Sequence, residues 1–169
     1  MPRPPAIELI VRGALRHRDN LLICRNRKHG HIFLPGGHIE HGEPARLALE
    51  REMLEELGQP LRAGRFLGVC ESAFHDPREH TRKQPPRAQR KPDAHPAAPT
   101  THEINLVFDL TAPPGIALDT IVSQERKIEF LWLPLNRLVG DSPEHHLLPH
   151  GIVALLDASR RGDGLVTAM

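Results

Sequence analysis

The sequence predicts a single domain of mixed α/β class. Short apolar segments that alternate like strands occur on both sides of one carboxylate-rich helical segment. A second helical segment near the end of the chain carries an apolar stripe. A chain of 169 residues suits one domain with one sizeable core, so we expect residues 1–169 to form a single unit.

Two strands are expected at the start of the chain. Apolar residues alternate at Ile7, Leu9 and Val11 within residues 6–15. A polar turn follows, and residues 21–25 then form an apolar, more buried strand. The two segments together predict an opening hairpin.

A basic loop and a glycine turn come next. Residues 25–29 are basic and form either a solvated turn or a contact for phosphate. Pro35 is followed by Gly36 and Gly37, which permit backbone torsions and close approaches that other residues forbid. A carbonyl freed in this turn could reach a cation, although a plain turn explains the glycines equally well.

The central helix is delimited by its end signals. Glu43 and Pro44 fit a helix start, because proline is tolerated in the first turn. Gly58, with Pro60 beyond it, fits a helix end. The apolar residues expected to pack on a sheet are Leu47, Leu49, Met53, Leu54 and Leu57.

The same helix carries three carboxylates on one side. Glu52, Glu55 and Glu56 lie within a sector of roughly 100° at ~100° per residue. Their mutual repulsion is unfavourable unless a hard divalent cation that prefers oxygen ligands binds there. Mg²⁺ is the first choice for such a cation. The alternative is an ordinary solvated helix face.

Beyond the helix, residues 65–74 are expected to form a strand. Residues 76–101 contain six prolines and six Lys or Arg but almost no residues to bury, which predicts a mobile insertion. Residues 102–110 form the clearest alternating strand, and Glu103 and Asn105 on one face indicate that this face looks into a cleft. A last strand at 130–135 and a helix at about 150–160 complete the domain.

A spaced motif joins the turn to the helix. It reads Gly37, five residues, Glu43, seven residues, Arg51-Glu52-Met53, one residue, Glu55-Glu56, one residue, Gly58. This pattern resembles the Nudix box, the signature of hydrolases that act on nucleoside diphosphates linked to another group X. One position departs from it: Gln59 stands where the family usually has an apolar residue, which affects packing and removes no ligand.

The resemblance implies a Nudix α/β/α sandwich with a mixed sheet. It also implies a Mg²⁺ site, with Mn²⁺ as the other metal, whose ligands are Gly37, Glu52, Glu55 and Glu56. The implied reaction is attack of water on the pyrophosphate bond of a small nucleotide. The alternative is a catalytically silent module that senses a nucleotide or binds a partner.

The catalytic residues predicted on this basis are Glu55, Glu56, Arg51 and Glu125. Glu55 shares metal binding with the role of general base. Arg51 is expected to pair with Glu43 or Glu55 and orient them, with a phosphate contact as its other reading. An extra acid outside the box is best matched by Glu125, with Glu129 and Glu103 behind it.

Composition limits location and partners. The formal net charge is +1, and the basic insertion has no aromatic residue, so nucleic acid is a disfavoured partner. Cys24 and Cys70 lie in apolar segments and are expected to be reduced core thiols. No apolar run reaches the ~20 residues of a membrane span, so we expect a soluble cytoplasmic protein without a membrane partner. A homodimer is compatible with the sequence.

Overall fold

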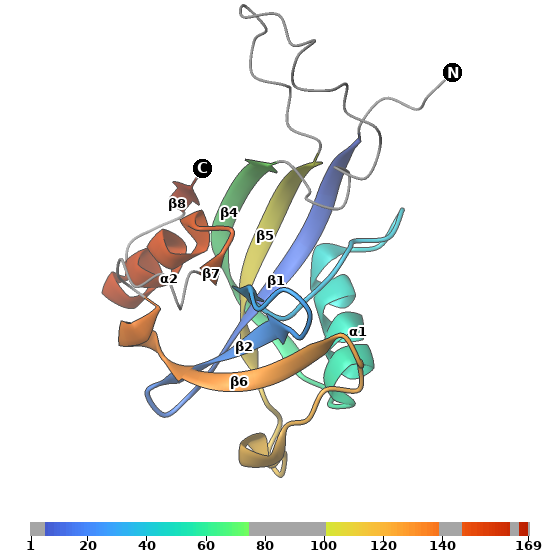
Figure 1. Cartoon of the computed structure of the whole chain (residues 1–169), viewed down its shortest axis with the longest axis vertical. Helices are drawn as coiled ribbons and strands as arrows, with labels where there is room; N and C mark the ends of the chain where they lie inside the picture. Colours follow the sequence, from blue (N-terminus) through green and yellow to red (C-terminus); the bar gives the residue numbers. More distant parts are fainter. Residues whose placement is uncertain (1–5, 75–100, 139–146, 163–165, 169) are drawn as a thin grey trace, which may run out of the picture.

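The computed structural model describes residues 6–74, 101–138, 147–162 and 166–168. The predicted insertion at 76–101 lies outside these ranges except for Thr101. In chain order the elements are β1 (Ile7–His17), β2 (Asn20–Asn26), β3 (Ile32–Phe33), α1 (Ala45–Leu57), β4 (Arg62–Phe74), β5 (Thr101–Thr111), η3 (Leu118–Thr120), β6 (Ile128–Pro134), η4 (Leu135–Arg137), β7 (Leu147–Leu148), α2 (Gly151–Arg161) and β8 (Val166–Ala168) (Figure 1).

The strands form one mixed sheet in the order β7-β3-β2-β1-β5-β4-β8, with β6 paired to β2. The predicted hairpin is confirmed only at its turn, where Arg16 pairs with Leu21 and His17 with Asn20. Outside this short pairing, β1 pairs in parallel with β5, while β2 pairs along its length with β6. The first two strands therefore contact each other only next to the turn and take most of their pairing from other strands.

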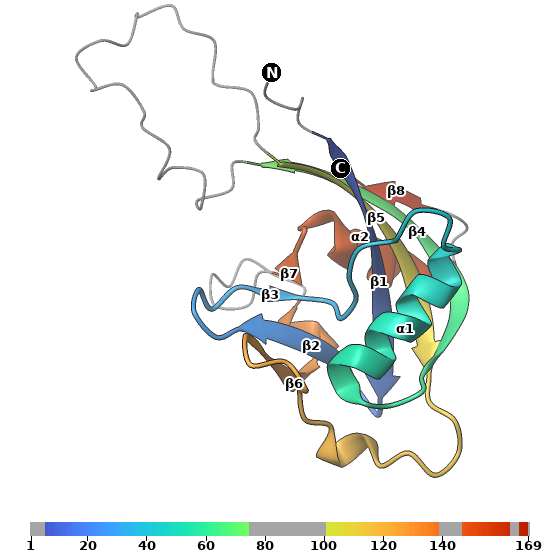
Figure 2. The same ribbon diagram turned by 90° about the vertical axis from the view of Figure 1, so that its right-hand side faces the viewer.

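Two helices cover opposite faces of the strands (Figure 2). On the α1 side the buried residues are Val11, Leu15, Leu22, Ala48, Leu49, Met53, Leu57, Leu61, Phe108 and Leu110. On the α2 side they include Ile152, Leu155 and Leu156, which pack against residues of the inner strands. The result is the three-layered α/β/α sandwich with a mixed sheet that the resemblance implies.

Helix α1 begins after Pro44 and ends at Gly58, as predicted. Gly58 has φ 66°, and its N–H donates to Leu54 O. One prediction for this helix is wrong: Leu47 and Leu54 are each 55% exposed and do not pack on the sheet. The reason is angular, because at ~100° per residue they lie on the far side of the helix from the buried Leu49.

The glycine turn runs along the free edge of β1. Gly13 N–H donates to Pro35 O and Val11 N–H to Gly37 O, both at 2.9 Å. Ile39 N–H donates to Leu9 O at 3.0 Å and continues the pairing. The turn is thus fixed between β1 and the helix that follows it.

Two further features concern the cysteines and the helices. Cys24 and Cys70 are buried free thiols, as predicted. None of the helices in the described part of the chain has the length and apolar character of a membrane span.

Candidate active site

The turn before α1 requires glycine at two positions. Gly36 has φ 132°, and a Cβ on it would clash with the carbonyl of Val11 in β1. A Cβ on Gly37 would clash with the carboxyl group of Glu52. The backbone therefore lies directly against β1 on one side and against a helix carboxylate on the other.

Glu56 is the buried carboxylate of the site, at 5% exposure. Its Oε2 accepts a hydrogen bond of 3.3 Å from Gly36 N–H. Burial raises the pKa of Glu56 to about 8, and the negative charges of Glu52 and Glu125 add to the rise. The hydrogen bond from Gly36 acts in the opposite direction, but it does not outweigh burial.

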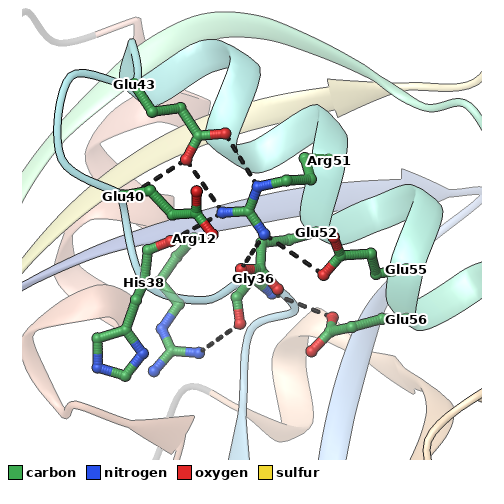
Figure 3. Close-up of polar contacts among 9 residues, drawn as sticks. All are labelled: Arg12, Gly36, His38, Glu40, Glu43, Arg51, Glu52, Glu55 and Glu56. Carbon is green, nitrogen blue, oxygen red and sulfur yellow. Dashed lines mark hydrogen bonds and ion pairs between the residues drawn. The ribbon is translucent and has the colours of Figure 1, made fainter.

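Arg51 joins the carboxylates of the turn and the helix (Figure 3). It donates to both oxygens of Glu43, from Nε at 2.9 Å and from Nη2 at 3.0 Å. Its Nη1 donates to Glu52 at 2.8 Å and to Glu55 at 3.3 Å. Nη2 also donates to His38 O at 3.0 Å, so one guanidinium ties the loop to three glutamates.

Each of the three acids considered outside the helix has a different environment. Gln124 N–H donates to Glu56 O at 2.7 Å, which brings Glu125 close enough to raise the pKa of Glu56. Glu129 instead pairs with the arginines of the basic loop, and Glu103 accepts from Asn105 at 3.4 Å. Of these acids, Glu125 is the one whose charge acts on Glu56 of the helix.

The contacts of the basic loop at residues 25–29 favour a structural turn over a phosphate contact. Arg25 and Arg27 pair with Glu129, and Arg27 also donates to Ile128 O. The side chain of Asn26 accepts from the N–H groups of Lys28 and His29 and closes the turn.

Sequence reasoning missed Arg12 of β1. Its guanidinium lies beside the glycine turn and contacts Asn105, the buried polar residue of β5. The available signal was an arginine within an apolar strand, on the opposite face from Val11. Its partners come from distant segments, so the sequence does not show that they meet.

The side chains fit an oxygen-ligated divalent cation. In the described ranges no three His, Cys, Asp or Glu side chains form a ready-made metal cluster, and Arg51 engages Glu52 and Glu55. Glu52 lies against Gly37, and Glu56 binds Gly36, so both carboxylates flank one turn. Burial and the charges of Glu52 and Glu125 raise the pKa of Glu56, and a hard cation bound beside it would favour its ionised form.

Comparison with known proteins supports this description. The model of the NUDIX domain family matches residues 2–154, so the chain belongs to that family. The resemblance seen in the glycine and glutamate spacing is thereby confirmed.

Individual relatives agree with the fold. A MutT protein from Methanosarcina mazei superposes with a TM-score of 0.65 at 19% identity, covering 95% of this chain and 97% of the other. A MutT protein from Bacillus halodurans gives 0.63 at 15% identity, covering 95% and 87%. In sequence, an ADP-ribose pyrophosphatase from Methanocaldococcus jannaschii is 39% identical over 67 residues, which are 37% of this chain and 40% of that protein.

Proposed function

We propose that this chain hydrolyses the pyrophosphate bond of a nucleoside diphosphate linked to a group X, with a divalent cation, Mg²⁺ or Mn²⁺. The observation that carries the proposal is the placement of Glu52 and Glu56, one helical turn apart on α1, against two successive residues of the turn, Glu52 at Gly37 and Glu56 at Gly36. Bound cations would screen the phosphates and lower the pKa of a bound water.

The proposed ligands are Glu52, Glu55 and Glu56, together with the turn backbone at Gly37. The Gly37 carbonyl already accepts from Val11 N–H, so any metal contact uses its second lone pair. Arg51 holds Glu43 by two hydrogen bonds and can keep them if it releases the other glutamates. Arg51 therefore orients the carboxylates, which deepens the role inferred from sequence.

Glu55 and Glu125 are the proposed groups for proton transfer, and Glu55 shares this role with metal binding. Glu55 is exposed on α1 and, among the described residues, is bonded to Arg51 through one oxygen, which leaves the other oxygen for a reacting water. Glu125 lies on the loop that is bonded to the end of α1, and its charge raises the pKa of Glu56. Glu55 is the proposed base, and Glu125 the additional acid that completes the site.

The choice of X starts from the named relative. ADP-ribose pyrophosphatase is the name of the archaeal protein that shares 39% identity over part of this chain. ADP-ribose is therefore the first substrate to assay, followed by nucleoside triphosphates and dinucleoside polyphosphates. We also propose a cytoplasmic location, which is supported by the buried free thiols of Cys24 and Cys70.

The experiment is a nucleotide screen with Mg²⁺ or Mn²⁺, with EDTA as control, read as release of a nucleoside monophosphate. We expect turnover of at least one compound that EDTA abolishes and added metal restores. Binding of a nucleotide without turnover across the panel would instead favour a silent sensor.

Glu56→Gln tests the site itself. It keeps shape and an acceptor for Gly36 N–H but removes the charge, so we expect kcat to fall by about 10²–10⁴-fold with the fold intact. Glu50→Gln is the matched control on the same helix, because Glu50 bonds to Arg62 and Ala63 on β4 instead. Near-normal metal-dependent turnover by Glu56→Gln would contradict the assignment.

A further inference from the structure

Arg12 makes three hydrogen bonds to groups that surround the candidate site. Its Nη1 donates to Leu34 O at 3.2 Å and to Gly36 O at 3.3 Å, the carbonyls on either side of Pro35. Figure 3 shows the bond to Gly36. Its Nε donates to the side-chain oxygen of Asn105 at 3.1 Å. One guanidinium of β1 thus connects the glycine turn to the neighbouring strand β5.

Asn105 and Phe33 hold the guanidinium group of Arg12 in position. Asn105 is fully buried, and its amide donates to Glu103 at 3.4 Å, which orients the oxygen that Arg12 binds. The centre of the guanidinium lies 5.3 Å from the ring centroid of Phe33. A side chain held on two sides in this way loses little further freedom when it binds the turn.

The Gly36 residue is held from both of its polar groups. Its carbonyl accepts from Arg12, and its N–H donates to the buried carboxylate of Glu56. The next residue, Gly37, lies against the carboxyl group of Glu52. A shift of this turn would therefore move the backbone against which both proposed ligand carboxylates are placed.

Arg12 is also a positive charge beside the acidic site, in addition to Arg51. Burial lowers its pKa, whereas the charges of Glu103, Glu56 and Glu52 all raise it. An arginine remains protonated in such surroundings. Its charge comes from β1, whereas Glu52 and Glu56 lie on α1 and Glu103 lies on β5.

We propose that Arg12, clamped by Asn105, is a positioning residue that holds the turn at residues 34–37 in the conformation that presents Glu52 and Glu56 to a divalent cation. This inference rests on the proposed pyrophosphatase function. It assigns to β1 a role in the reaction that the glycine and glutamate spacing does not include.

Three variants test it. Arg12→Met removes all the donors, Arg12→Lys keeps the charge with a single donor group, and Asn105→Leu removes the clamp but leaves Arg12. Each is measured for Mn²⁺ affinity without substrate, for hydrogen exchange of the Gly36 and Gly37 amides, and for kcat and KM. We expect Arg12→Met to weaken Mn²⁺ binding or kcat by about 10–100-fold, as loss of an outer partner of a metal ligand does.

The pattern across the variants distinguishes positioning from general packing. We expect faster exchange at Gly36 and Gly37, a smaller change in KM than in kcat, and partial recovery in Arg12→Lys. Asn105→Leu is expected to change the same quantities in the same direction. Should Arg12→Met leave Mn²⁺ affinity, kcat and amide exchange at the turn as in the unmodified protein, the inference is wrong.

Arg46 supplies a matched control from the other side of α1. It also donates to a backbone carbonyl, Ala63 O at 2.8 Å, and lies 5.3 Å from the ring centroid of Phe108. Arg46→Met therefore removes similar contacts away from the site, and we expect unchanged metal affinity. Failure of the unmodified protein to bind metal or turn over any nucleotide would count against the proposed function, whereas amide exchange at the turn tests the role of Arg12 separately.

Discussion

Gly37 has no room for a side chain, because a Cβ there would clash with the carboxyl group of Glu52. Gly37→Ala should therefore displace Glu52, and we expect kcat to fall by about 10–100-fold through misplacement of a ligand. Turnover with Mg²⁺ as a function of metal concentration measures this. Gly42→Ala is the control: that glycine has φ 82° but open space around it, so it strains the loop without touching a carboxylate. Equal losses from both variants would refute the steric argument.

For single residues, the sequence predicted the position of a side chain where spacing along one helix determines that position. Glu52, Glu55 and Glu56 share a face of α1 because of helical geometry, and the guanidinium of Arg51 reaches two of them. Arg12 could not be placed in the same way. Its position depends on the parallel pairing of β1 with β5, which joins segments about a hundred residues apart and leaves no local pattern.

At the scale of the element, α1 shows how burial selects among similar residues. Leu49 is fully buried in the core on this side of the sheet, while Leu54 is 55% exposed. We expect Leu49→Ala to lower the free energy of unfolding by about 2–5 kcal/mol. Leu54→Ala should change it by less than about 0.5 kcal/mol. Urea denaturation of the two variants checks this, and similar losses would mean that the helix is rotated.

The elements differ in how far they could be predicted. Long segments with clear alternation or clear ends, such as β5 and α1, were located to within a few residues. Strands β3 and β7 have two residues each and β8 has three, too short to carry a periodic pattern. Tertiary pairing forms them, as it does the run of residues 35–39 along β1.

At the scale of the whole molecule, the site makes stability depend on pH. The pKa of Glu56 is about 8 in the folded chain and 4.5 as the ordinary value. Between these two values the unfolded chain gives up the proton that the folded chain retains, so the folded state loses stability as pH rises through this window. Below pH 4.5 the carboxyl is neutral in both states and has no effect. Above about pH 8 the penalty is complete.

Comparison of the unmodified protein with Glu56→Gln isolates this effect, because other groups titrate alike in both. We expect Glu56→Gln to gain stability over the unmodified protein as pH rises from 5 to 8 without metal, by an amount on the order of a few kcal/mol. Mg²⁺ should reduce the difference, because a cation that binds only the folded chain stabilises the unmodified protein more than the variant. Thermal unfolding at several pH values, with EDTA and with Mg²⁺, measures both. A difference that stays constant with pH would show that Glu56 is already ionised in the folded chain, and a difference that Mg²⁺ leaves unchanged would show that this carboxylate does not bind the metal.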